Sequence, residues 1–135
     1  MDCLFCKIIA GAIPSTKVYE DDLVFAFLDI HPKNFGHTLV VPKTHHEMLL
    51  DLPESLLGGF LGSVQQVARA IVYATKADGF NLAMNNGEAA GQLIPHAHMH
   101  IIPRHAGDFQ EHHRHLTYKT GEAELLAQKI KESLE

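Results

Sequence analysis

The chain has 135 residues, of which 46% are hydrophobic and 20% are charged. These fractions are typical of a single globular domain and exclude a disordered chain and a membrane protein. The formal net charge of −5 excludes general affinity for nucleic-acid backbones, which requires clustered Lys and Arg. The eleven histidines are the unusual feature of the composition, because imidazole titrates near neutral pH and is a common metal ligand.

The N-terminal segment carries the only two cysteines, Cys3 and Cys6. It lacks the basic start and the long apolar stretch of a secretory signal, and no later window is apolar for about 18 residues. We therefore expect a cytoplasmic protein without a membrane partner. In a reducing compartment a Cys-x-x-Cys pair indicates a metal or redox site more than a disulfide, and two ordinary buried thiols are the third interpretation.

Strand-forming residues dominate the next part of the chain. Residues 18–30 are rich in Val, Phe, Leu and Tyr around the acidic turn 20–22, which predicts two strands in a hairpin, and residues 37–41 predict a third strand. Apolar residues then recur every three or four positions over residues 53–77, which predicts a long core helix. Pro53 suits the first turn of this helix, where its missing N–H has no helical partner to lose.

Shorter elements follow the long helix. Asp78-Gly79 supplies the end of the helix, and residues 80–84 predict a strand. Residues 85–87, Asn-Asn-Gly, predict a turn before a further strand over 96–104, and residues 121–134 predict a terminal helix. Hairpin-linked strands with one long helix between two strand groups favour an α+β fold built on an antiparallel sheet.

Three histidines alternate in the run His96-Ala97-His98-Met99-His100. In a strand, residues two apart project from the same face, so the three imidazoles are expected to line one surface while the intervening residues and Ile101 face the core. Packing gives no reason to select imidazole three times. The cluster therefore indicates either metal ligation or nucleophilic catalysis.

This run resembles the signature of the histidine-triad (HIT) family, in which three histidines alternate with apolar residues and two apolar residues follow. The resemblance extends to segments before the triad: Asp29 within 27–30, residues 36–45, the turn 85–87, and Gly91-Gln92. It implies a HIT-like α+β fold, with an antiparallel sheet packed against one long central helix and with short terminal helices.

The resemblance also implies how the chain is divided. We expect a single HIT domain over residues 1–135, in which 105–120 form a variable loop and 121–135 a C-terminal helix. Members of the family usually pair as homodimers whose sheets join across the two-fold axis, with the long helix at the interface.

The catalytic roles follow from the same resemblance. His98 is the nucleophile that attacks the α-phosphorus and forms a nucleotidyl-histidine, and the carbonyl of His96 is the acceptor that holds its other ring N–H. Gln92, Asn85 and His100 are expected around the phosphate, where fixed donors stabilise its negative charge. His100 can also protonate the leaving group.

The resemblance implies a purine nucleotide as the substrate. Asp29 occupies the position of a carboxylate that binds the ribose hydroxyls, and the competing interpretation is a solvated Asp at a strand end. Four apolar residues match positions that cradle the purine, although such residues in a small protein are usually core. They are Phe5, Ile8, Phe27 and Ile30.

A subset of the family binds one structural zinc ion through residues that match Cys3, Cys6, His45 and His96. These four would form a closed Cys₂His₂ tetrahedron, so we expect about one structural zinc per chain and no catalytic metal. His46 competes with His45 for the role, but it faces the other way if the segment is extended.

Two features depart from the family or go beyond it. Leu93 stands where many members carry a Ser or Thr that donates to the leaving group, so the reaction class is better supported than the substrate. The segment 105–115 adds four histidines, for which a second metal site, a specificity segment near the phosphate and a solvated loop are all open, and Gly107 with its polar flanks favours the loop.

The leading hypothesis is a hydrolase or transferase that acts on purine nucleoside phosphoramidates or dinucleoside polyphosphates. A metallohydrolase whose triad binds a catalytic metal is one alternative. A regulatory protein that binds nucleotides in the triad pocket with little turnover is the other.

Overall fold

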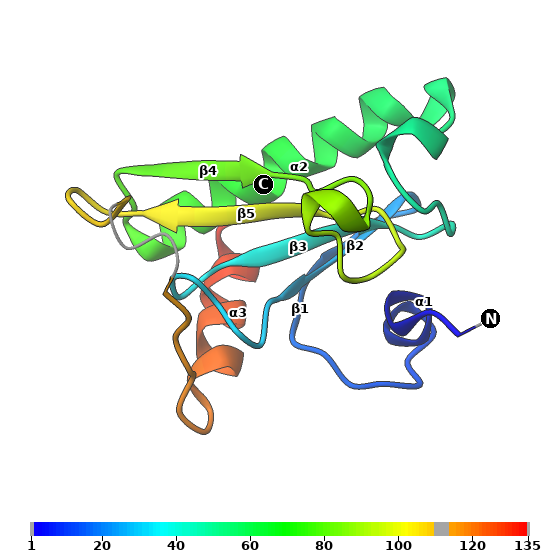
Figure 1. Ribbon diagram of the computed structural model, residues 1–135. Coiled ribbons are helices and arrows are strands. Elements are labelled where there is room, and N and C mark those ends of the chain that lie inside the picture. Colours follow the sequence, from blue (N-terminus) through cyan, green and yellow to red (C-terminus); the bar gives the residue numbers. More distant parts are fainter. Residues whose placement is uncertain (1, 110–113, 135) are drawn as a thin grey trace.

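The structure is a computed structural model that describes residues 2–109 and 114–134 of the chain (Figure 1). Its elements follow in this order: α1 (Leu4–Ile9), β1 (Lys17–Glu20), β2 (Val24–Leu28), β3 (Thr38–Pro42), the 3-10 turn Leu49–Asp51, α2 (Glu54–Thr75), β4 (Gly79–Ala83), the 3-10 turn Glu88–Ala90, β5 (Met99–Arg104) and α3 (Glu122–Glu132).

The five strands form one antiparallel sheet in the order β1-β2-β3-β5-β4. The long helix α2 lies along one side of this sheet, and the short α1 lies on the other (Figure 1). The predicted α+β architecture, with its antiparallel sheet, long helix and short terminal helices, is confirmed.

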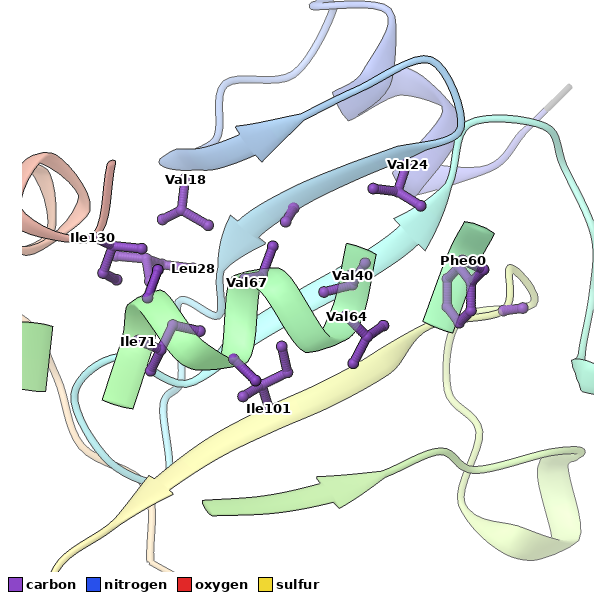
Figure 2. Packing of buried hydrophobic residues seen from close by; sticks show 14 of the residues in the cluster. Val18, Val24, Leu28, Val40, Phe60, Val64, Val67, Ile71, Ile101 and Ile130 are labelled. Carbon is purple, nitrogen blue, oxygen red and sulfur yellow. The ribbon is translucent and has the colours of Figure 1, made fainter. Parts of the chain in front are cut away.

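Both faces of β2 and β3 are buried, because each strand contributes to two clusters of apolar side chains. Alternation sends Leu28 and Val40 toward Val64, Val67 and Ile71 of α2 (Figure 2). The opposite face carries a second cluster beneath α1, made of Cys3, Phe5, Ile8, Phe25, Phe27, Leu39 and Val41. This second cluster supports the rings of His96 and His98, which contact Phe5.

The ends of α2 differ from the prediction. Pro53 is extended and precedes the helix as its N-cap, rather than lying in the first turn. The helix ends at Thr75 because Lys76 takes a left-handed conformation, with φ of 56°, and its N–H binds the carbonyls of Val72 and Tyr73. Asp78-Gly79 does not stop the helix, since Gly79 already pairs with Arg104 at the start of β4.

The strand predicted over 96–104 begins only at Met99. The backbone before Met99 does not join the hydrogen-bond ladder of the sheet. Ala97 donates its N–H to the carbonyl of His46, and the carbonyl of His96 accepts from the side chain of His98. The predicted separation of faces nevertheless holds. Ala97, Met99 and Ile101 pack in the cluster under α2, while the rings of His98 and Phe5 meet on the other side of the sheet.

Residues 114–120, which lead into α3, carry no helix or strand. The predicted loop over 105–120 falls partly on residues 110–113, which lie outside the described residues. A single domain over 1–135 with these boundaries stays a prediction. Within 2–109 and 114–134, no helix combines the length and the apolar character that crossing a bilayer requires.

Candidate active site and metal cluster

His98 lies almost fully buried at the entry to β5, and its two ring nitrogens have different environments. Nδ1 lies 2.7 Å from the carbonyl oxygen of His96. Because a carbonyl only accepts, Nδ1 carries the proton and the lone pair is on Nε2. Burial lowers the pKa of His98, so the ring is neutral at pH 7 and Nε2 can act as a nucleophile.

His100 is oriented by a second histidine, His37, which is buried at the start of β3. The backbone N–H of Lys33 donates to His37 Nδ1 at 3.0 Å, so His37 carries its proton on Nε2. That Nε2 lies 2.9 Å from His100 Nδ1, which must therefore accept. His100 is left with its proton on Nε2, and its ring lies 5.0 Å from that of His98.

Burial keeps both members of this pair uncharged. It lowers the pKa of His37 to about 4, against the opposing attraction of Asp29, and it lowers the pKa of His100 to about 4 as well. Lys33 pushes both values in the same direction as burial. The pair is a neutral N–H···N hydrogen bond at pH 7.

Asp29, His37 and His100 place three possible ligand atoms within 4.8 Å of one another. A metal on His37 Nε2 would require the proton to move to Nδ1, where it would face the N–H of Lys33. Two donors facing each other are unfavourable. The hydrogen bonds therefore favour a hydrogen-bond chain that fixes the tautomers of His37 and His100 over a metal site.

Asp29 follows β2, with one carboxylate oxygen accepting from the N–H of His31 at 2.9 Å and the other 3.6 Å from His37 Nε2. Its side chain is partly exposed. The structure thus places the predicted ribose carboxylate beside the His37–His100 pair, with acceptor capacity remaining on both oxygens.

The side-chain amide of Gln92 is hydrogen-bonded to backbone groups of the surrounding loops. Its amide nitrogen donates to the carbonyls of Glu47 and Ile94, at 2.6 and 3.0 Å, and its oxygen accepts from Gly87. Both amide hydrogens are engaged, so Gln92 braces the loops around the triad rather than offering a free donor. Asn85 is half-buried, and its amide lies beside Gly91, whose φ of 91° favours glycine.

The four predicted purine contacts divide into two groups. Phe5, Ile8 and Phe27 are buried in the cluster under α1, and the Phe5 ring meets His98 edge-on with centroids 5.1 Å apart. Ile30 is 76% exposed. Phe5 therefore supports the ring of His98, and Ile30 is the member of the set that presents an exposed apolar surface.

Four predicted metal ligands from three separate segments converge beside the triad. Their ligand atoms all lie within 4.8 Å of one another, and four of the separations are 3.2, 3.3, 3.4 and 3.6 Å. A tetrahedral zinc ion with nitrogen ligands at about 2.0–2.1 Å and sulfur ligands at about 2.3 Å separates its donors by about 3.3–3.8 Å. The cluster of Cys3, Cys6, His45 and His96 fits zinc.

The hydrogen bonds around this cluster agree with metal ligation. His96 is fully buried, and its Nε2 donates to the carbonyl of Pro42 at 2.8 Å, which leaves the lone pair of Nδ1 directed at the cysteines. His46 is turned away and pairs with the Thr44 hydroxyl. The structure therefore brings His45, and not His46, to the cluster.

Sequence reasoning missed His37 as a site residue. It lies one residue before a β-strand and is a single histidine among eleven, so its pattern carries no signal of its own. The available signal was its position in the segment 36–45, which already belonged to the resemblance. Its partner, the N–H of Lys33, is a backbone group and leaves no trace in the sequence.

A family model matches much of the chain. The HIT domain model aligns with residues 10–107, which include His37, His45 and the whole triad.

Relatives whose activities are named include two eukaryotic enzymes. The adenylylsulfatase HINT3 of Arabidopsis thaliana is 49% identical over 107 residues, which are 79% of this chain and 54% of that protein. The chain thus spans about half the length of this relative. The adenosine 5'-monophosphoramidase HNT1 of Saccharomyces cerevisiae is 42% identical over 102 residues, or 76% of this chain and 62% of that protein.

Solved structures resemble this one over nearly the whole chain. A HIT-like protein from Bartonella henselae, described as involved in cell-cycle regulation, superposes with a TM-score of 0.88 and 40% identity over 98% of this chain and 97% of that chain. A zinc-bound histidine-triad family protein from Mycobacterium smegmatis gives a TM-score of 0.85 and 36% identity, covering 98% and 93%.

Proposed function

Since the chain belongs to the HIT domain family, we propose that it is a hydrolase or transferase that cleaves purine nucleotides at the α-phosphate through a nucleotidyl-histidine on His98. The observation that carries this proposal is the hydrogen bond from His98 Nδ1 to the carbonyl of His96. It leaves the Nε2 lone pair available on a neutral ring.

The reaction proceeds in two displacements. In the first, His98 Nε2 forms a bond to the α-phosphorus, and the bond from phosphorus to the leaving group breaks. The leaving group takes its proton from water, while His100 Nε2–H donates a hydrogen bond to it. In the second, water or another acceptor attacks the same phosphorus and loses a proton to solvent, and the bond from phosphorus to His98 Nε2 breaks.

His100 acts in both steps as a neutral hydrogen-bond donor that the hydrogen bonds from Lys33 through His37 hold in place. Asn85 can donate to the phosphate oxygens from the loop before the triad. Gln92 supports this loop through its bonds to Glu47 and Ile94. The fixed donors act where negative charge develops, in a site that is already partly dry.

The substrate proposal covers nucleoside phosphoramidates, dinucleoside polyphosphates and related mixed anhydrides. A phosphoramidase and an adenylylsulfatase among the relatives support cleavage next to an adenylyl group. Asp29 would bind the ribose diol, and Ile30 would offer apolar surface to the purine. Leu93 is 88% exposed and has no donor, so leaving groups that depart without strong proton donation are favoured.

We also propose that Cys3, Cys6, His45 and His96 hold one structural zinc ion. A zinc-bound relative and the spacing of the four ligand atoms support this assignment. All four coordination positions would be protein side chains, so the metal would supply rigidity rather than chemistry. A cytoplasmic location agrees with Cys3 and Cys6, which are not joined in a disulfide.

A second copy of the chain is the proposed partner. A groove of about 710 Å³ runs between α2 and β4 and is lined by Leu61, Val72, Phe80 and Leu82. β4 is the last strand of the sheet, so one of its edges has no strand beside it among the described residues. Edge pairing with a second β4 would cover both features.

The test is the turnover of adenosine 5'-phosphoramidate and adenosine 5'-phosphosulfate by the parent and by His98→Ala. We expect the variant to lose at least about 10³-fold in kcat/KM on both substrates. The matched control is His105→Ala, which removes an exposed histidine remote from the triad and should retain the parent rate. Equal turnover by His98→Ala and the parent would rule out nucleophilic catalysis by His98.

The same assay separates the two alternatives. A binding protein would show nucleotide affinity in the parent without turnover. A metallohydrolase with a triad-bound metal would lose activity on chelation while its fold persists, and activity would return with metal. The geometry disfavours that mechanism, because the ring nitrogens of His96 face Pro42 and the cysteines rather than a shared point with His98 and His100.

A further inference from the structure

The segment that leads from residue 114 into α3 is fastened to the residues that follow β2. Leu116 donates its N–H to the carbonyl of Pro32 at 2.6 Å, and His115 Nδ1 donates to the carbonyl of His31 at 3.0 Å. Arg114 donates from Nε to the carbonyl of Lys33 at 3.2 Å and from its guanidinium to the side-chain oxygen of Asn34. Three successive residues thus grip one short stretch of backbone.

Asn34 is the fixed centre of this arrangement. It is 4% exposed, and its amide nitrogen donates to the carbonyl of Pro103 at 2.8 Å and to the carboxylate of Asp108 at 2.9 Å. Its carbonyl accepts from the N–H of His37. Arg114 therefore completes the hydrogen bonding of a buried side chain that joins β5 to the turn before β3.

The stretch of backbone held by residues 114–116 contains the N–H group that selects the tautomer of His37. The N–H of Lys33 donates to His37 Nδ1, and His37 in turn donates to His100. Arg114 binds the carbonyl of Lys33, and the N–H of the same residue, one peptide group earlier in the chain, donates to His37, which donates to His100. Displacing the N–H of Lys33 would allow the His37 proton to move to Nδ1 and would release His100.

We propose that Arg114 is a positioning residue for the reaction, because it clamps Lys33 and Asn34 and thereby holds the backbone donor that aligns His37 with His100. This inference rests on the proposed function for its catalytic consequence, while the alignment itself is independent of turnover. Arg114 lies outside residues 10–107, which match the family model.

The experiment compares the parent, Arg114→Met, Arg114→Lys and Tyr118→Phe. Nitrogen-15 NMR of the imidazole rings reports the tautomers of His37 and His100. We expect Nε2–H on both rings in the parent and a new Nδ1–H population of His37 in Arg114→Met. Arg114→Lys, which keeps one donor, should lie between the two.

Tyr118→Phe is the matched control, because Tyr118 accepts from the N–H of Gly36 and fastens the same segment without contacting Lys33. It should keep the parent tautomers. On the substrates above, kcat of Arg114→Met should fall about 10-fold while KM stays within about twofold, since only alignment changes.

Parent tautomers in both Arg114 variants would overturn the proposal, as would an equal shift in Tyr118→Phe. If Arg114→Met fails to fold, Arg114→Lys decides by the same spectrum. A parent without turnover would contradict the proposed function, and the His37 tautomers would still show whether Arg114 sets the alignment.

Discussion

Four buried or half-buried imidazoles share the site, and the backbone decides where each ring carries its proton. The carbonyls of Pro42 and His96 fix His96 and His98, and the N–H of Lys33 fixes His37 and, through it, His100. As a consequence, chemically identical side chains differ in which ring nitrogen donates and which accepts. His96 directs a lone pair at the cysteines, His98 has a lone pair on Nε2, and His37 holds His100 as an Nε2–H donor.

Acidification should destabilise the protein because of this burial. The pKa of His100 is about 4 in the folded chain, against 6.5 without burial. Between these values the unfolded chain binds a proton that the folded chain does not, so the free energy of unfolding falls as the pH decreases from about 6.5 to about 4. The full effect for His100 is on the order of 3 kcal/mol.

Urea unfolding of the parent and of His100→Asn at about pH 7 and about pH 5 measures this effect. We expect the parent to lose more stability than the variant between the two conditions, since the variant lacks one group that takes up a proton on unfolding. An equal loss in both proteins would contradict the assignment of His100 as a buried neutral donor.

The sequence could supply some of these side chains and not others. Alternation predicted which face of the triad is polar, and the resemblance supplied Asp29 and the four cluster residues. It could not predict that Gln92 is engaged by Glu47 and Ile94, since these partners are backbone carbonyls. For the same reason the partner that orients His100 was missed.

At the scale of elements, α1 depends on its surroundings. It has six residues, and a helix of this length does not persist alone in water. It is held by Phe5 and Ile8 in the apolar cluster and by Cys3 and Cys6 at its start, where the Cys3 sulfur accepts from the N–H of Cys6. The proposed zinc would tie this helix to the triad through His96.

Zinc removal is expected to loosen α1 in particular. Metal analysis of the purified protein should find about one zinc per chain, and the double variant Cys3→Ser with Cys6→Ser should lose it. Hydrogen exchange of the backbone over Leu4–Ile9 should rise in the double variant far more than exchange in α2. A parent that contains no metal, or a double variant with unchanged exchange in α1, would contradict the structural role.

Periodicity predicted the strands and the long helix well, but it did not predict their ends. Three-or-four-residue spacing marks α2 because that face packs on the sheet, whereas its end depends on Lys76 in a conformation that Lys rarely adopts. The start of β5 was placed three residues early, since His96 and Ala97 bond outside the ladder. Local bonding, rather than hydrophobic pattern, decides such boundaries.

For the whole molecule, the groove between α2 and β4 is the feature that the isolated chain leaves uncovered. Leu61, Phe80 and Leu82 are each between 43% and 54% exposed around it. Large apolar side chains gathered beside an open strand edge are typical of an interface. A dimer would place this face in the interior.

Light scattering should therefore give a mass of twice 15.0 kDa for the parent in solution. Leu61→Glu combined with Leu82→Glu should give a monomer, because two charges would be buried without partners. Leu125→Glu, which adds charge at an exposed position of α3 away from the groove, should remain a dimer. A monomeric parent, or a dimeric double variant, would exclude this interface.

The acceptor for the Nδ1–H of His98 is the main-chain carbonyl of His96, which has a consequence for mutation as well as for chemistry. It belongs to the main chain, so no single codon change can delete the acceptor that holds the proton of His98. A substitution at position 96 would remove the imidazole from the proposed zinc cluster while the acceptor oxygen remained. Metal binding and the tautomer of His98 can therefore be changed independently.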